Sequence, residues 1–186
     1  MNIVHFILGF PPQRSGGLTK YAIGLANAEK SLGHNVFIMY PGNFSFFSKK
    51  SKLKKITDGI YELTNGLPVP LLYGIRCPLK FHERREIVGL DEFIKEVKPE
   101  VFHIHTLMGL PKELLLSLKA IGVKIVYTSH DYYGFCPKVN FIDNNGETCE
   151  EADSARCSHC CRKSPCLLFL KIRNSKFIVL FKKIHN

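Results

Sequence analysis

The sequence of 186 residues predicts an α/β fold built on an open parallel sheet. Short apolar runs that suit buried strands alternate with stretches of helical periodicity from residue 1 to residue 128, and this alternation is typical of such folds. Apolar residues make up 45% of the chain and charged residues 23%, an ordinary globular composition. The length suits one domain with a sizeable core, so a disordered or fibrous chain is excluded.

The first three elements are expected to form a strand–helix–strand unit. Residues 3–8 are apolar and are followed by Gly9 and two prolines, which is typical of a short buried strand. A helix is expected from Leu18, because apolar residues recur at helical spacing up to Gly33. Residues 35–39 have the composition of the next strand. Two strands joined through a helix are parallel members of one sheet.

The middle of the chain has a weaker pattern. Residues 40–80 are expected to form a loop, with an edge strand near residues 59–63. Helical periodicity returns after Glu83 and ends before Pro99. The expected architecture is a Rossmann-like open parallel sheet with helices on both faces. The elements expected after Pro99 are a strand at 101–105, a helix from Pro111 and a strand at 123–128.

The last third of the chain differs in character. Residues 132–166 hold six of the seven cysteines and no sustained period, so an irregular Cys-rich insertion is expected there. Residues 167–186 have the pattern of a basic, amphipathic C-terminal helix. We therefore divide the chain into a sheet domain at 1–131, the Cys-rich segment of the same domain at 132–166, and the helix at 167–186.

The charge balance is basic. Lys and Arg total 26 against 16 Asp and Glu, which gives a formal net charge of +10. Two stretches without an acid contribute to it, at residues 49–55 and from Lys171 to the end. Such runs suit lipid head groups, nucleotide phosphates or nucleic acid, although residues 49–55 could equally be a solvated loop. Because no nucleic-acid-binding motif is present, we expect no nucleic-acid partner.

The C-terminal helix has two interpretations. Apolar residues can line one side while lysines reach toward anionic lipid, which would place the helix on a membrane surface. The helix could instead pack against another part of a longer protein. The residues on which both interpretations rest are Lys176, Phe177, Ile178, Leu180, Phe181, Lys182, Lys183 and Ile184.

No targeting or membrane-spanning segment is visible. The first residues lack a basic stretch, and the chain has no run of about 18 uncharged apolar residues. We expect a cytoplasmic protein, peripheral on the inner face of the membrane if the C-terminal helix binds lipid. Its cysteines are then expected to be reduced or metal-bound rather than paired in disulfides.

A first candidate site lies between the first strand and the first helix. Ser15, Gly16 and Gly17 come directly before the helix. Glycines let a ligand approach the backbone, and the helix N-terminus offers unpaired N–H groups and the positive end of its dipole. This pattern predicts an anion site, most simply for a phosphate. It matches neither GxGxxG nor GxxxxGK[ST], and a plain strand-to-helix turn would have the same sequence.

His105, His130 and Asp131 supply a second candidate site. The strand at 101–105 puts His103 and His105 on one face, with His105 at the carboxyl edge where open α/β sheets bind ligands. His105 could donate to a phosphate or a sugar hydroxyl or move a proton; the alternative is a buried core residue, which we expect for His103. His130 and Asp131 end the next strand and could bind sugar hydroxyls or cap a turn.

The spacing of four cysteines predicts a metal site. Cys136, Cys149, Cys157 and Cys160 follow the pattern C-x12-C-x7-C-x2-C. A C-x2-C step is how one turn of chain offers two thiolates to a tetrahedral metal. A structural zinc ion would hold the irregular segment in shape. The alternative is a loop of reduced, partly buried cysteines, and a catalytic cysteine is not expected among so many thiols.

Three stretches together resemble glycosyl transferase family 4. Residues 10–36 (FPPQRSGGLTKYAIGLANAEKSLGHNV) resemble the opening of the family's N-terminal domain, with its Gly-Gly loop, Ala- and Leu-spaced helix and Gly-His-x-Val. Residues 99–111 (PEVFHIHTLMGLP) resemble the family's strand ending in histidine. Residues 126–137 (VYTSHDYYGFCP), followed by spaced cysteines, are similar to a subgroup that makes bacterial surface polysaccharides.

This resemblance implies a GT-B architecture and a retaining glycosyltransferase of the hexosyltransferase type. The N-terminal domain would receive a lipid-linked or polysaccharide acceptor, and a C-terminal domain would hold the nucleotide-sugar. Gly16 and Gly17 would lie near the donor diphosphate, and His105 would be the catalytic residue at the reacting sugar. His130 and Asp131 would line the acceptor side. No catalytic metal is expected, because transfer in this family usually needs none.

The donor-binding half is expected to be absent from these residues. The family's E-x7-E motif follows a Gly-rich loop, whereas Glu92 and Glu100 show that spacing on a predicted helix that runs into Pro99. Residues 1–186 alone are therefore expected to show little transfer. The competing hypothesis is a zinc-stabilised module without activity, which docks on a membrane or on a partner protein.

Overall fold

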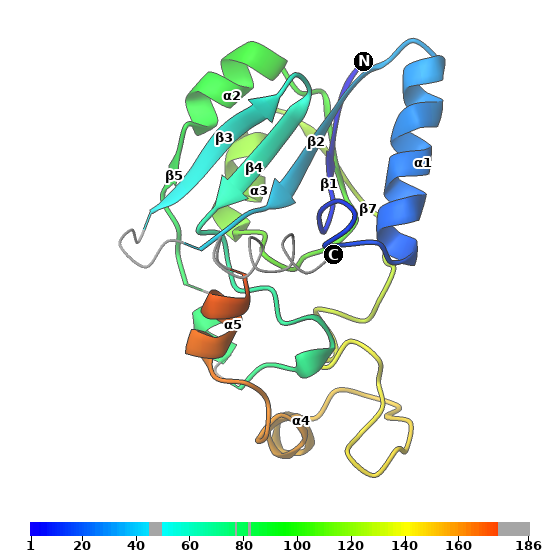
Figure 1. Ribbon diagram of the computed structural model, residues 1–186, viewed down its shortest axis with the longest axis vertical. Helices are drawn as coiled ribbons and strands as arrows, with labels where there is room; N and C mark the ends of the chain where they lie inside the picture. Colours follow the sequence, from blue (N-terminus) through cyan, green and yellow to red (C-terminus); the bar gives the residue numbers. More distant parts are fainter. Residues whose placement is uncertain (45–49, 77, 82, 175–186) are drawn as a thin grey trace.

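The computed structural model describes residues 1–44, 50–76, 78–81 and 83–174 (Figure 1). The strands within these residues are β1 (Asn2–Phe6), β2 (Asn35–Pro41), β3 (Ser51–Thr57), β4 (Ile60–Thr64), β5 (Ile87–Val88), β6 (Val101–Ile104) and β7 (Lys124–Tyr127). They form one sheet in the order β5-β3-β4-β2-β1-β6-β7. Neighbouring strands are parallel except for β3 and β4. The expected open and largely parallel α/β sheet is confirmed.

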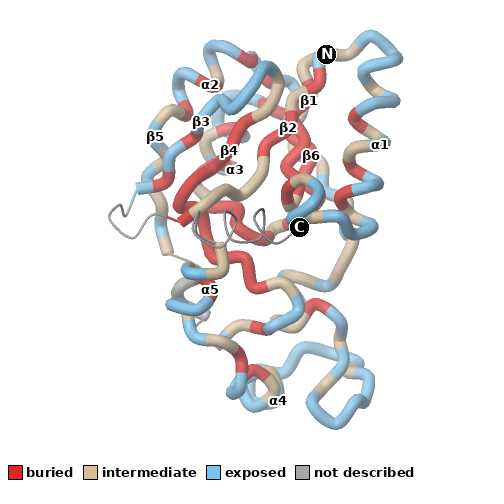
Figure 2. The backbone as a smooth tube through the Cα atoms, in the orientation of Figure 1, coloured by how far each residue is buried: buried red, intermediate tan, exposed pale blue. Residues whose placement is uncertain are grey.

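Helices cover both faces of this sheet (Figure 1). On one face lies α1 (Gly17–Ser31), whose small Ala22 and Ala26 pack against the strands. On the other lie α2 (Leu90–Val97) and α3 (Lys112–Ala120). Figure 2 shows that burial is concentrated in the strands between these layers. The larger apolar cluster, on the α2–α3 face, includes Val4, Phe6, Phe93, Phe102, Leu114 and Leu118.

The prediction of a loop for residues 40–80 is wrong in the central part of this range, which forms two strands. Residues 51–55 of the lysine run belong to β3, which pairs with β4 through a two-residue Asp58-Gly59 turn. Gly59 has a φ of +75°, as this hairpin turn requires. Leu53 points into the core while the lysines of β3 are exposed, so the strand is half-buried at its start and solvated beyond it. β4 lies between β3 and β2 and is not an edge strand.

The helix expected after Glu83 begins later than its periodicity indicated. Ile87 belongs to the short strand β5, which pairs with β3. Gly89 separates the two elements with a φ of +86°, a left-handed conformation that favours glycine. The helix α2 then runs from Leu90 to Val97. The periodicity was correct for the helix itself but extended over the preceding strand.

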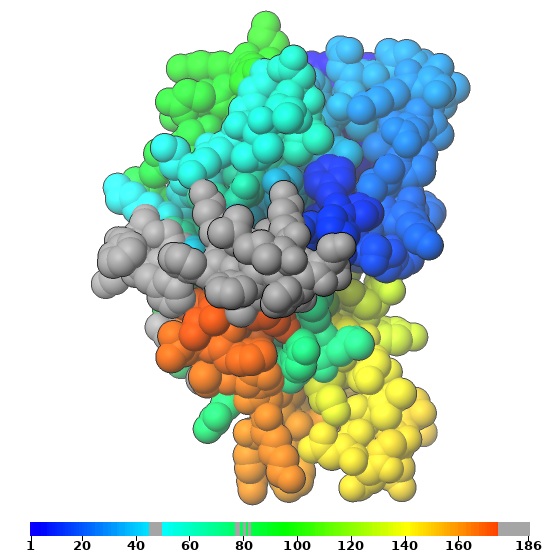
Figure 3. All heavy atoms as spheres, viewed as in Figure 1, coloured from blue at the N-terminus to red at the C-terminus, as the bar shows by residue number. Residues whose placement is uncertain are grey.

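Residues 132–166 follow an irregular path, in which the structure describes one short helix, α4 (Ser154–Cys160). The helix α5 (Leu167–Arg173) comes after it. Figure 3 shows these segments, in yellow to orange-red, gathered at the end of the molecule opposite α2. The residues on which the membrane interpretation rests, 176–184, lie outside the described part of the chain. Among the described residues, no helix is long and apolar enough to cross a membrane.

Candidate functional site

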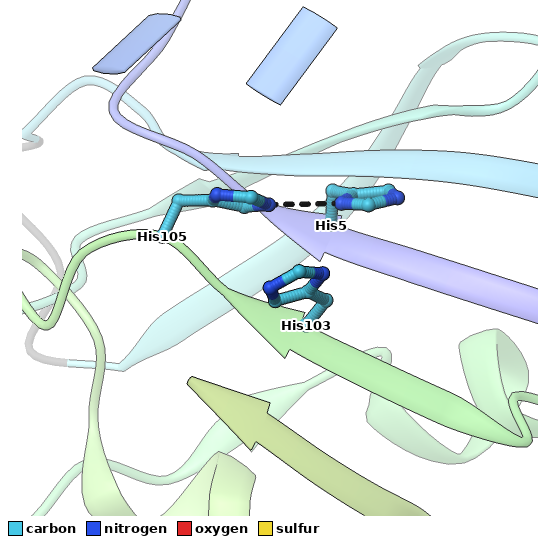
Figure 4. A group of neighbouring side chains, drawn as sticks. All are labelled: His5, His103 and His105. Carbon is cyan, nitrogen blue, oxygen red and sulfur yellow. Dashed lines mark hydrogen bonds between the residues drawn. The ribbon is translucent and has the colours of Figure 1, made fainter. Parts of the chain in front are cut away.

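Four histidines converge at the carboxyl edge of the central strands. His5 of β1 and His103 of β6 are direct neighbours in the register of the sheet. His105 follows β6, and His130 follows β7. Because side chains alternate along a strand, His103 and His105 share the face on which α1 lies. Figure 4 shows His5, His103 and His105 with their rings gathered between these strands.

Three hydrogen bonds join three of these rings into a chain that ends on a carboxylate of α1. His5 Nε2 lies 2.6 Å from Glu29 Oε2. His5 Nδ1 lies 2.9 Å from His105 Nε2, the dashed line in Figure 4. His105 Nδ1 lies 3.1 Å from His130 Nε2. The order of the chain is therefore Glu29, His5, His105 and His130.

The carboxylate sets the direction of every hydrogen bond in the chain. An ionised carboxylate only accepts, so His5 donates to Glu29 from Nε2, and in its neutral form it accepts at Nδ1. A neutral imidazole has one donor and one acceptor nitrogen, so His105 must donate from Nε2 and accept at Nδ1. His130 then donates from Nε2. Its Nδ1 is left as an acceptor at the outer end of the chain.

Burial disfavours the charged forms of His103, His105 and His130. Burial, with smaller contributions from the neighbouring His103, His5 and His130, lowers the pKa of His105 to about 3. Burial also lowers the pKa of His103, and it lowers the pKa of His130 against the opposing effect of Asp131. A desolvated imidazole resists protonation because its charged form loses hydration. At neutral pH His105 is therefore neutral, as its assigned tautomer requires.

His130 is the member of the chain that reaches the surface. His5 and His105 are 0% and 1% exposed, whereas His130 is only half-buried. The exposed ring of Tyr21, from α1, packs edge-on to His130 with 5.0 Å between ring centroids. Both nitrogens of His105 are already bonded to histidines. The predicted role of His105 at the sugar would thus be exerted through His130.

His103 and Asp131 have partners outside the histidine chain. His103 Nε2 lies 2.8 Å from the hydroxyl of Thr128. This contact fits the expectation of a satisfied core histidine. Asp131 accepts from the backbone N–H of Tyr133 at 2.9 Å, which is the turn-capping contact that we gave as its alternative. Its contact with an acceptor sugar stays a prediction.

The Gly-Gly stretch forms an open helix start. Gly16 is the N-cap of α1, and no side chain caps the helix or places an acid in its first turn. A Cβ added at Gly16 or at Gly17 would meet no atom within 4 Å. The first N–H groups of α1 are therefore accessible to a ligand, which is the geometry of an anion site. Tyr21 lies on the next turn of α1, so this helix start and His130 belong to the same edge.

Two arginines that the sequence analysis did not assign to this site add positive charge here. Arg14 precedes the helix start. Burial lowers the pKa of Arg14, and the nearby positive charge of Arg173, from α5, lowers it further. Arg173 donates to the backbone carbonyl of Val69 and lies 4.8 Å from the ring centroid of Tyr73. Among the residues that the structure describes, its Nε and Nη1 are buried and have no hydrogen-bond partner. Unsatisfied buried donors of a cation suit an anionic ligand.

The three inner histidines also form the one described group that could hold a metal ion. His5, His103 and His105 offer ring nitrogens within 4.8 Å of one another. Two nitrogens bound to one tetrahedral zinc would lie about 3.3 Å apart, given bonds of about 2.0 Å. The 2.9 Å between His5 and His105 is shorter and fits a direct hydrogen bond. A metal would have to displace that proton.

The predicted zinc ligands are only partly gathered. Cys136 and Cys149 are close enough to Cys160 to raise the pKa of its thiol, which burial raises more strongly. Cys160 Sγ contacts Asn144 Oδ1 at 3.6 Å. Apart from the histidine group, no three metal-ligating side chains of the described residues lie within 4.8 Å of one another. The zinc site stays a prediction.

An open parallel sheet with an uncapped helix start and a polar cluster at its carboxyl edge is the arrangement of a ligand-binding α/β domain. The chain matches the model of Glycosyltransferase Family 4 over residues 15–148. It therefore belongs to this family. The match includes Gly16, Gly17, His105 and His130, and it identifies the chain as a glycosyltransferase domain. No curated protein and no solved structure gives a significant match.

Proposed function

We propose that this chain is the acceptor side of a retaining GT-B glycosyltransferase of the hexosyltransferase type. It would transfer a sugar from a nucleotide-sugar to a lipid-linked or polysaccharide acceptor, in a pathway that makes bacterial surface polysaccharide. The observation that carries the proposal is the histidine chain, which ends in an acceptor nitrogen of His130 on the same edge as the open start of α1. A sugar hydroxyl and a phosphate would meet these two features.

The open helix start would stabilise the leaving diphosphate. As the bond from the sugar to the diphosphate breaks, negative charge grows on the phosphate oxygens. The N–H groups after Gly16 and Gly17 and the dipole of α1 are fixed in place before the reaction, so their stabilisation of this charge costs no rearrangement. Arg14 and Arg173 would add to the positive potential. A donor-binding domain would hold the nucleotide.

The histidine chain would hold a sugar hydroxyl. Nδ1 of His130 would accept its hydrogen bond, and His105 would orient the His130 ring by accepting from Nε2. Packing against Tyr21 further restrains that ring. A ring with a fixed tautomer and a fixed orientation holds a reacting group with little loss of entropy. No metal ion takes part in this step.

The Cys-rich segment would have a structural role. We propose that Cys136, Cys149, Cys157 and Cys160 bind a zinc ion that fixes residues 132–166. The proximity of Cys136 and Cys149 to Cys160 supports this assignment. The basic C-terminal residues would keep the enzyme at the inner, anionic face of the membrane, where a lipid-linked acceptor is found.

Substitution of single histidines in the full-length protein tests the proposal. We expect His130→Ala and His105→Ala to lower kcat about 100-fold or more, as for loss of a positioned polar group. His34→Ala is the matched control, because His34 follows α1 at the opposite end of the helix. It should retain normal turnover. Normal turnover of a correctly folded His130→Ala would contradict the proposed role.

A further inference from the structure

A cavity of about 730 Å³ lies beyond the carboxyl ends of three strands. Leu67 lines it after β4, Leu107 and Leu110 line it after β6, and Tyr133 and Phe135 line it after β7. Its volume falls in the range of small-molecule sites, and its position is the edge at which open α/β sheets bind ligands. None of its lining residues belongs to the histidine chain. It is a separate space on the same edge of the sheet.

The floor of the cavity is apolar. Leu67, Phe81 and Leu110 are buried, and Leu115 of α3 packs beside them. The facing wall comes from the Cys-rich segment. Cys136 and Pro137 lie in its irregular part, Cys157 lies on α4, and Cys161 directly follows that helix. This segment therefore forms a second wall of the cavity. An apolar space of this size suits the hydrocarbon part of a ligand.

The charged side chains of the cavity are mostly cations at its exposed margin. Arg76, Lys112 and Arg162 line it and are all exposed. The acid in the lining, Glu83, is engaged by Arg85 at 2.9 Å. Lys112 is the first residue of α3, so the positive end of that helix adds to the potential. A ligand that matches this cavity is apolar within and anionic at its outer end.

We propose that the cavity binds an amphiphilic anion, a hydrocarbon chain that carries a phosphate head group. The chain lies against Leu67, Leu110 and Leu115, and Arg76, Lys112 and Arg162 hold the phosphate. The exposed ring of Phe135 covers the chain where it enters. In terms of the proposed function, this ligand is the lipid part of the acceptor. The backbone of Tyr133, which lines the cavity, is bonded to Asp131, next to His130, so the cavity adjoins the histidine chain.

Three probes separate the apolar and anionic contributions. Decyl phosphate, decanol and inorganic phosphate are titrated into the full-length protein by calorimetry. Decyl phosphate is kept below its critical micelle concentration and decanol below its solubility limit. We expect decyl phosphate to bind about tenfold or more tightly than either of the others. Equal affinity of decanol and decyl phosphate would overturn the phosphate assignment. Equal affinity of inorganic phosphate and decyl phosphate would overturn the hydrocarbon assignment.

Variants then place the ligand in this cavity. Ser158 lines it and is exposed, so Ser158→Trp fills it without disturbing the core. Ala155→Trp adds a comparable bulk on the same helix, at an exposed position outside the lining. We expect Ser158→Trp to weaken decyl phosphate about tenfold and Ala155→Trp to leave it unchanged. Equal behaviour of the two variants would overturn the placement.

Charge removal tests the head-group contact. We expect Lys112→Gln with Arg162→Gln to weaken decyl phosphate about tenfold while decanol binding is retained. Lys119→Gln, on an exposed position of α3 outside the lining, is the control. Unchanged binding of decyl phosphate to the double variant would overturn the assignment. These measurements need no donor and no turnover, so tight binding without transfer would count against the proposed function alone.

Discussion

Nδ1 of His5 and Nε2 of His105 lie 2.9 Å apart on the buried face of the sheet that α1 covers, although the two residues are 100 positions apart in the sequence. Both rings are fully buried, and each uses its other nitrogen in a second hydrogen bond. The pair therefore connects Glu29 to His130 through continuous hydrogen bonds. This relationship has consequences for activity and for stability that can be measured separately.

Glu29→Gln tests whether charge is transmitted along the chain. The carboxylate favours protonation of the rings, so its removal should lower the pKa of His130. If turnover needs neutral His130, the acidic limb of the pH–rate profile should move to lower pH by about 0.5 to 1 unit. A structural role alone would lower kcat without moving this limb. Glu92→Gln, on an exposed position of α2, is the control and should leave the profile unchanged.

Acid should destabilise the fold through the same rings. His105 has a pKa of about 3 in the folded protein and about 6.5 when unfolded, so the unfolded chain binds more protons between these values. The stabilisation is complete above pH 6.5 and is lost as the pH falls toward 3. At pH 5 the stability lost through this residue amounts to at most about 2 kcal/mol. Urea unfolding at pH 7 and pH 5 measures the difference, and equal stability of the protein at both values would contradict the prediction.

Gly17→Ala should separate stability from donor binding. Gly17 is the first residue of α1, and an added Cβ meets no atom within 4 Å, so the variant should gain about 0.5 to 1 kcal/mol of stability. The methyl group would occupy space next to the proposed diphosphate. We expect the KM for the nucleotide-sugar to rise about tenfold. Gly24→Ala, also on α1 and equally open, should gain similar stability with an unchanged KM. An unchanged KM in Gly17→Ala would contradict the proposed position of the phosphate at this helix start.

The zinc prediction is tested by metal analysis of purified protein. We expect about one zinc ion per chain and a lower unfolding temperature after chelation, because a structural zinc contributes to folding free energy. Cys136→Ser and Cys149→Ser should lose the metal. Cys166→Ser should retain it, since Cys166 is exposed and outside the predicted set. Protein that binds no zinc from a zinc-containing buffer would exclude the site.

The sequence predicted the parallel half of the sheet because each of its strands is a continuous apolar run next to an amphipathic helix. It failed for β3, where lysines alternate with the few core residues and suggest a solvated loop. The Asp58-Gly59 pair was the available signal, since this dipeptide is typical of two-residue hairpin turns. A lysine-rich strand at the antiparallel side of a sheet has one solvated face, so its composition resembles that of a loop.

The candidate site was only partly predictable for a different reason. His105, His130 and Gly16 could be found because strand ends and helix starts are visible in a sequence. His5 could not be assigned a role, because its partner is fixed by the register of β1 against β6. Glu29 lies near the C-terminal end of α1, far from the helix start, and Arg173 lies at the end of the described chain. Their contacts arise from tertiary packing, which no local pattern encodes.

The central position of β1 also constrains how this chain is made. Its edge toward β2 can pair once about 40 residues are synthesised, but its edge toward β6 waits until Val101–Ile104 has left the ribosome. Closing such a long loop is entropically costly and slow. Until then His5 has neither its neighbour in β6 nor the covering chain, and one side of an apolar strand stays unpaired. Nascent chains of intermediate length are therefore the species most in need of chaperone protection.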